Sequence, residues 1–148
     1  MLRLQLSRIA LLAIGATSLM ACSQQPVQTP SLADTEWQLV EIEGKPPAVA
    51  EDKRPTLMLL AIEDRAHGNG GCNRYSGSYT RADNGLKFGA MMQTKIGCEA
   101  EINRSEQQFH AVLARVTQLR HRADQLELLA NDGAVLLRLR ALGSNDAP

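Results

Sequence analysis

Residues 125–139 read QLELLANDGAVLLRL, and this stretch decides the fold class. The pair Asp132-Gly133 is a strong turn signal between two leucine-rich runs. Counting outward from a two-residue turn there pairs apolar residues on one face: Leu126 with Leu139, Leu128 with Leu137, and Ala130 with Val135. Glu127 then lies opposite Arg138. Because register, apolar face and charge pair agree, we predict an antiparallel hairpin at this end of the chain.

Two upstream segments also have the pattern of strands. Residues 35–43 (TEWQLVEIE) place Trp37 and Leu39 on one face, with acidic residues interleaved. Residues 56–62 (TLMLLAI) are apolar on both faces, which predicts a strand that is covered on both sides.

A second hairpin signal lies in the middle of the chain. The turn sequence Asp83-Asn84-Gly85 separates strand-like residues 76–81 from residues 86–88. Together with the other strand patterns, it predicts a sheet that is mostly antiparallel.

One segment has helical periodicity. Residues 103–119 are predicted to form an amphipathic helix, and Asn103 with Glu106 has the spacing of a capping box. The apolar residues of one helix face are Phe109, Val112, Leu113 and Val116. We therefore predict an α+β fold in which a curved, roll-like antiparallel β-sheet packs against one main α-helix.

The first residues have the features of an export signal. Residues 1–21 open with two cations and no acid and continue as an apolar run, too short to remain as a membrane-spanning helix. The sequence LMAC at 19–22 resembles the lipobox of bacterial lipoproteins, which implies cleavage before Cys22 and acylation of its sulfur. The alternative is an ordinary secretory signal in which the cysteine is incidental.

The lipobox resemblance predicts where the protein is located. Multiple acyl chains on Cys22 would anchor it to a membrane without a transmembrane helix. In lipoproteins retained in the inner membrane, an aspartate follows the acylated cysteine. Here the residue after Cys22 is Ser23, so the sequence does not resemble that retention signal. We therefore expect an exported outer-membrane lipoprotein that faces the periplasm.

The rest of the chain is predicted to hold one domain. Residues 22–31 form a polar, proline-containing tether, residues 32–142 the globular domain, and residues 143–148 a disordered tail. The whole chain has 16 basic and 16 acidic residues, so no excess of positive charge favours nucleic acid. We expect a monomer, with an envelope protein as its possible partner and no nucleic acid bound.

The sequence GGCNRYSGSY at 70–79 is very similar to the central motif of the META domain, the family of HslJ-like heat-inducible lipoproteins. Residues 34–37 (DTEW), residues 94–98 and the predicted helix resemble other parts of that family. The chain departs from the family pattern at Ile96-Gly97, before Cys98. The motif and structural residues that the resemblance covers are Trp37, Gly70, Gly71, Cys72, Asn73, Tyr75, Gly77, Tyr79, Cys98, Glu106 and Phe109.

Cys72 and Cys98 are the two cysteines that remain if Cys22 is acylated. In an exported protein such a pair is predicted to form a disulfide, worth about 3 to 4 kcal/mol in the chain-entropy model. Buried free thiols, or a redox or metal pair, are the alternatives. The glycines beside Cys72 favour a tight corner, whereas a phosphate-binding loop would need a lysine and a hydroxyl that are missing.

Other chemistry has weak support in the sequence. His67 and His110 could in principle join the two cysteines around a metal, but no close zinc-type spacing exists. Acidic residues two apart, such as Glu41 and Glu43, share the outer face of a strand. We therefore expect no catalytic residue, no metal and no cofactor.

The function that we predict is a noncatalytic, lipid-anchored envelope protein that acts as an interaction or stress-response module. The stress component is what the family resemblance implies. The first alternative is a carrier or sensor of a small hydrophobic ligand, with a cavity lined by Met58, Met91 and Met92. The second alternative is a thiol-based redox enzyme.

Overall fold

The computed structural model describes residues 29–143. The predicted signal peptide, the predicted acylation site at Cys22, most of the predicted tether and the tail from residue 144 lie outside the described residues. Within the described part of the chain, no helix is both long and apolar enough to cross a membrane.

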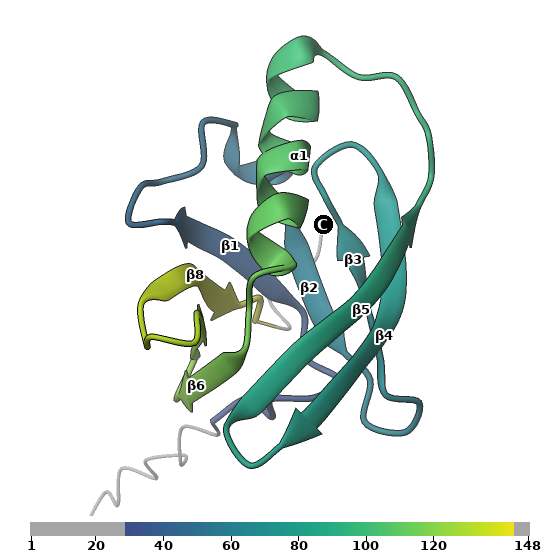
Figure 1. Ribbon diagram of the computed structural model, residues 1–148. Coiled ribbons are helices and arrows are strands. Elements are labelled where there is room, and N and C mark those ends of the chain that lie inside the picture. Colours follow the sequence, from purple (N-terminus) through teal and green to yellow (C-terminus); the bar gives the residue numbers. More distant parts are fainter. Residues whose placement is uncertain (1–28, 144–148) are drawn as a thin grey trace, which may run out of the picture.

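Eight strands and one α-helix make up the domain (Figure 1). The elements in chain order are β1 (Trp37–Ile42), the short 3-10 helix η1 (Glu51–Lys53), β2 (Thr56–Leu59), β3 (Arg65–Asn69), β4 (Arg74–Ala82), β5 (Gly85–Gln93), α1 (Ala100–Leu113), β6 (Gln118–Arg122), β7 (Gln125–Leu129) and β8 (Val135–Ala141). Every strand pairs antiparallel with its neighbours, and β8 returns to β1 so that the sheet closes as a barrel. The predicted α+β class, a curved antiparallel sheet with one helix, is confirmed.

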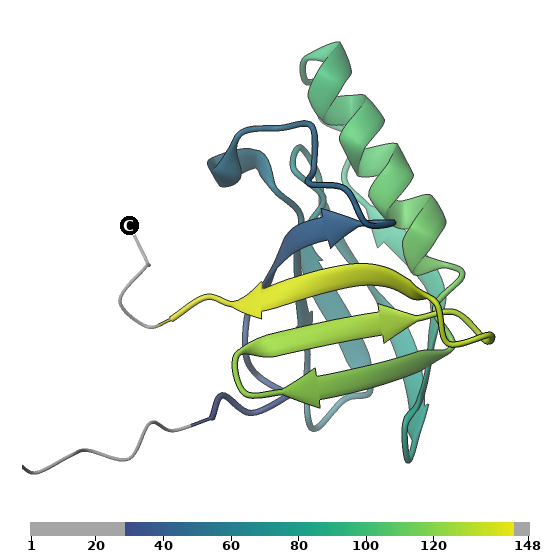
Figure 2. The same cartoon turned by 90° about the vertical axis from the view of Figure 1, so that its left-hand side faces the viewer.

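The core lies inside the closed sheet and under α1. Trp37 and Phe109 are fully buried among leucines from β1, β2, β7 and β8. Figure 2 shows the three C-terminal strands, β6, β7 and β8, side by side, with α1 at the upper right. The interior is therefore filled by side chains, as in other small barrels.

The C-terminal hairpin has the predicted register along most of its length. Leu126 pairs with Leu139 and Leu128 with Leu137, and Glu127 lies opposite Arg138 and accepts its hydrogen bonds. The predicted pairing of Ala130 with Val135 is wrong, because a bulge shifts the register so that Leu129 faces Val135. The turn is also longer than predicted: the Ala130 N–H donates to the carbonyl of Ala134, and Gly133 takes a positive φ of 84°. This is the usual geometry of a three-residue hairpin loop.

The central hairpin is confirmed, but its strands are longer than predicted. Ala82 pairs with Gly85, so the turn is Asp83-Asn84 and Gly85 begins β5. Asp83 takes the positive φ of 51°, a conformation that aspartate tolerates.

The prediction for residues 56–62 is wrong in extent and in burial. β2 ends at Leu59, and Ile62 is 96% exposed beyond it. Leu57 and Leu59 are buried, whereas Met58 is only partly covered, so the strand has one buried face. The strand stops there because the Leu60 N–H donates to the carbonyl of Arg65, which closes the turn into β3.

The helix lies earlier in the chain than predicted. It runs from Ala100 to Leu113, and Val116 is buried beyond its end. Asn103 is not the N-cap but lies in the first turns, where its side chain donates to the carbonyl of Cys98. The predicted capping box is therefore wrong, because Glu106 points into the protein and serves a tertiary contact instead.

Candidate functional site

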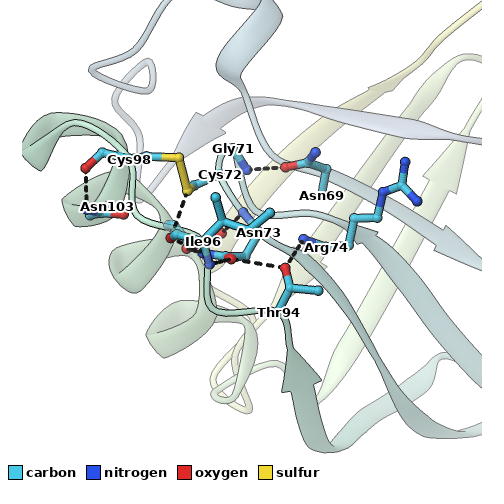
Figure 3. Close-up of a disulfide and its surroundings, with 10 residues drawn as sticks. Asn69, Gly71, Cys72, Asn73, Arg74, Thr94, Ile96, Cys98 and Asn103 are labelled. Carbon is cyan, nitrogen blue, oxygen red and sulfur yellow. Dashed lines mark hydrogen bonds between the residues drawn. A yellow bond between two sulfur atoms is a disulfide. The ribbon is translucent and has the colours of Figure 1, made fainter.

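A disulfide joins the corner before β4 to the segment that leads into α1 (Figure 3). Cys72 and Cys98 are bonded with their Cα atoms 6.1 Å apart. The Cys72 sulfur also lies 3.4 Å from the carbonyl oxygen of Ile96, a contact without a hydrogen bond because a disulfide sulfur carries no proton. The bond therefore fixes one end of the β5–α1 connection, residues 94–99, against the corner.

Asn73 ties three parts of the chain together beside the disulfide. Its backbone N–H donates to Glu106 Oε1 at 2.7 Å, and its side-chain amide donates to Glu106 Oε2 at 2.8 Å. Its side-chain oxygen accepts from the Ile96 N–H at 2.7 Å and from the Thr94 hydroxyl at 3.0 Å. Because Asn73 and Glu106 are almost fully buried, these bonds satisfy groups that would otherwise be costly to bury.

Two motif glycines allow this close packing. A Cβ at Gly70 would clash with Glu106 Oε1 and lie 2.8 Å from its Cγ. Gly71 has a φ of 112°, and a Cβ there would lie 2.7 Å from the carbonyl oxygen of Lys53. The glycines therefore serve backbone geometry at this corner.

The two motif tyrosines brace neighbouring strands. The Tyr75 hydroxyl donates to the carbonyl of Thr56 at 2.7 Å, and the Tyr79 hydroxyl donates to the carbonyl of Leu60 at 3.0 Å. Burial raises the pKa of Tyr75 far above its ordinary value, and burial together with nearby Asp64 also raises the pKa of Tyr79. Both hydroxyls therefore stay protonated as donors. Gly77 lies beside a bulge in β5, and a Cβ at Gly77 would lie 2.5 Å from the sulfur of Met91.

His110 lies on α1 beside this framework. Its ring meets the ring of Tyr75 edge-on, with centroids 5.0 Å apart, and its Nε2 atom is buried without a hydrogen-bond partner among the described residues. Burial lowers the pKa of His110, and the negative charge of Glu106 opposes this shift only in part. The imidazole is therefore held in its neutral form near pH 7.

A groove runs between β5 and α1. At the end near the disulfide it forms a cavity of about 530 Å³, and towards the end of α1 it continues as a cavity of about 240 Å³. Gln93 and His110 line both cavities. The first cavity has a mixed lining that includes Lys95, Ile96 and Gln107, whereas the second is mainly apolar and includes Phe88, Met91 and Leu113.

The groove was predicted only in part, as the cavity of the ligand-carrier alternative: Met91 lines the second cavity, whereas Met58 contacts His67 and Met92 lines neither cavity. The predicted strand at residues 86–88 is too short, because β5 continues to Gln93. The available signal was the run Gly89-Ala90-Met91-Met92, in which two small residues precede two apolar ones. Ile96 lines the first cavity and is 60% exposed, so one large apolar side chain lies open in the groove. Met92, which is 68% exposed, lines a separate hollow with Arg74 and Ser76 of β4.

The other sequence candidates do not come together. His67 Nε2 lies 3.2 Å from the sulfur of Met58, and the cysteines bond to each other. No group of three or more His, Cys, Asp or Glu side chains within residues 29–143 is placed to hold a metal ion.

An ion-pair network covers the outer face of the C-terminal strands. Glu127 accepts hydrogen bonds from Arg120 at 2.6 Å and from Arg138 at 3.2 Å, and Arg138 also pairs with Glu41. Burial alone would raise the pKa of Glu127, but the two arginines outweigh it and the pKa is lowered. These acidic residues therefore act as ion-pair partners.

The fold and the site define a small α+β domain in which a disulfide and a buried Asn–Glu pair hold a helix against a closed antiparallel sheet. The family model "META domain" matches residues 30–142. The chain therefore belongs to the META domain family, as the motif at 70–79 predicted.

Solved structures with the same fold are known. A protein from Burkholderia xenovorans solved by NMR is 26% identical, with a TM-score of 0.60 over 84% of this chain and 99% of that chain. A second NMR structure is 21% identical, with a TM-score of 0.54 over 72% of this chain and 87% of that chain. A DUF4847 family protein from Bacteroides vulgatus is 12% identical, with a TM-score of 0.53 over 74% of this chain and 93% of that chain. Comparison with curated proteins found no match.

Proposed function

We propose that this protein is a noncatalytic, lipid-anchored module of the cell envelope that binds a partner protein in the groove between β5 and α1. The lipobox-like sequence at 19–22 supports the anchor and an outer-membrane location facing the periplasm. The likeness to heat-inducible lipoproteins supports a role under envelope stress.

The groove carries the binding proposal. Its walls are joined at one end by the disulfide and by the hydrogen bonds of Asn73, so its shape is set before any partner binds. Ile96 exposes apolar surface in the first cavity and Phe88, Met91 and Leu113 line the second, while Lys95 and Gln107 add polar groups. Apolar anchors within a polar rim are the usual make-up of a protein-binding site.

The arrangement of the reactive side chains supports a noncatalytic role. Cys72 and Cys98 are bonded to each other, and both oxygens of Glu106 are engaged by Asn73. Both motif tyrosines donate their hydroxyl protons to backbone carbonyls. These groups act as structural partners, which leaves the groove for recognition.

The test is photocrosslinking from the membrane-anchored protein in living cells. A photoreactive residue at Gln107 or Lys95 reports on the groove, and one at the exposed Arg122 in the β6–β7 hairpin is the matched control. We expect one protein to be captured from the groove positions and not from Arg122. Capture of lipid alone, or of nothing, at both groove positions would contradict the proposal and favour a ligand carrier.

A further inference from the structure

The edge of β5 that faces the groove is almost entirely unpaired. β5 pairs with β4 from Gly85 to Gln93, but its pairing with β6 is limited to Gly85 opposite Gln118. The Leu86 N–H donates to the carbonyl of Thr117 just beyond this bridge. Within residues 29–143, no other strand pairs with β5 on this side.

Strand geometry identifies the backbone groups along this edge. In an antiparallel pair, one residue directs its N–H and C=O groups towards the partner strand, and the next residue directs its groups away from that strand. Leu86 bonds on the open side, so Phe88 directs its groups the same way. The Thr94 N–H donates to the carbonyl of Arg74 on β4, so Gln93 and Met91 direct theirs into the groove. The alternation shifts by one residue between Phe88 and Met91 because β5 has a bulge there.

Cavities separate this edge of β5 from the helix. α1 lies across the groove from β5, and Leu113 and Ala114 line the cavity of about 240 Å³ between them. A helix satisfies its own backbone and offers no pairing to the strand edge. Since an added strand lies about 4.8 Å from its neighbour, an extended chain can enter between β5 and α1.

We infer that an extended segment of a partner polypeptide binds here by adding to the edge of β5 as a further strand. Its backbone pairs with the outward groups of Phe88, Met91 and Gln93. Alternate side chains are apolar and enter the space beside Phe88 and Leu113, or cover Met92 on the outer side. This inference rests on the proposed function and identifies the partner that the groove recognises.

The charges beside the groove indicate an acidic residue in the segment. Lys95 lines the groove and Lys87 lies exposed on β5, and neither has an ion-pair partner among the described residues. The one acid that lines the cavity, Glu106, is already bound by Asn73. A carboxylate in the segment therefore complements Lys95 or Lys87.

A second copy of the domain is disfavoured as the occupant. Pairing β5 with β5 of another copy would bring a whole folded sheet against an edge that α1 flanks. A single extended chain meets no such obstacle.

A proline substitution tests the strand addition. Gln93→Pro removes an N–H that the fold does not use, whereas Gln93→Ala removes the same side chain and keeps the N–H. We expect Gln93→Pro to reduce groove crosslinking and partner affinity about tenfold, and Gln93→Ala to change them less than about threefold. Melting temperatures of both variants show whether the domain remains folded.

Hydrogen exchange tests the same inference in the unmodified chain. The probes are synthetic peptides of about seven residues in which valine alternates with threonine, with one glutamate near an end. Binding should slow amide exchange at Met91 and Gln93, while Met92 and Thr94, which face β4, are the internal control. Methylating alternate backbone nitrogens of the peptide should abolish this protection.

The outcomes separate the inference from the proposed function. If Gln107 captures a protein and Gln93→Pro leaves that capture unchanged, strand addition is overturned and the binding module stands. If no probe peptide slows exchange at Met91 or Gln93, strand addition is likewise overturned. If sedimentation shows a dimer that Gln93→Pro dissociates, the occupant is a second copy and the inference of a partner segment is wrong.

Discussion

Glu106 on α1 accepts two hydrogen bonds from Asn73, one from the backbone N–H at 2.7 Å and one from the side-chain amide at 2.8 Å. Both residues are almost fully buried, so a carboxylate and an amide of distant segments satisfy each other in the interior. Because Asn73 follows Cys72 directly, this pair and the disulfide act on the same corner.

Replacing Glu106 with glutamine should destabilise the domain. Glutamine presents one amide nitrogen where both carboxylate oxygens now accept hydrogen bonds, so one buried donor of Asn73 loses its partner. We expect the free energy of unfolding to fall by about 1 to 3 kcal/mol in chemical denaturation. Glu101→Gln, at an exposed position on the same helix, should change it by less than about 0.5 kcal/mol. Equal effects of the two variants would contradict the role of the Asn73 contact.

A side chain at Gly70 should interfere with the same contact. Gly70→Ala places a Cβ against Glu106, so α1 or the corner has to move, at a cost of about 1 to 3 kcal/mol. Gly97→Ala is the matched control, since nothing lies within 4 Å of a Cβ there. We expect Gly97→Ala to be neutral or slightly stabilising in thermal denaturation. A neutral effect of Gly70→Ala would show that Gly70 does not pack closely against Glu106.

Removing the disulfide should lower stability without changing the fold. The double variant Cys72→Ser, Cys98→Ser loses a cross-link worth about 3 kcal/mol, which corresponds to a drop of several degrees in melting temperature. A reductant should lower the melting temperature of the parent protein and leave that of the double variant unchanged. A parent protein insensitive to reductant would contradict a stabilising role.

Stability should depend on pH through His110. Burial lowers its pKa in the folded state, so below the ordinary histidine pKa of about 6.5 the unfolded state binds more protons than the folded one. The stability of the parent protein relative to His110→Gln should therefore be constant above about pH 7.5 and decline as the pH falls below about 6.5. Denaturant titrations of both proteins across this range measure the difference. Parallel pH profiles would show that His110 does not titrate differently on folding.

The anchor predicted at Cys22 is tested by labelling cells with an alkyne fatty acid. We expect the parent protein to incorporate the label and to sediment with membranes. Cys22→Ala should lose the label, because no other cysteine follows a lipobox-like sequence. The double variant without the disulfide is the control and should keep the label. Unlabelled parent protein would contradict the proposed anchor.

Several features were predicted correctly because they depend on neighbouring residues. The turn signal and alternating leucines were sufficient to pair Leu126 with Leu139 and to place Glu127 opposite Arg138. The register was wrong only beside the loop, where a bulge and the positive φ of Gly133 lengthen the turn. The helical periodicity located α1, although the predicted end was too late because Val116, which continues the apolar spacing, is buried beyond the helix.

The sequence by itself determined the α+β class, the C-terminal hairpin, the helical segment and, through the motif at 70–79, the family. Only the tertiary structure decided that Glu106 meets Asn73 across 33 positions of the chain, and that β5 leaves β6 after Gly85 with an open edge facing α1. The physical reason is the distance along the chain over which each effect acts. Turn chemistry and apolar periodicity depend on residues that are close in the sequence. Buried polar pairs and unpaired strand edges arise when distant segments pack together, and no local pattern encodes them.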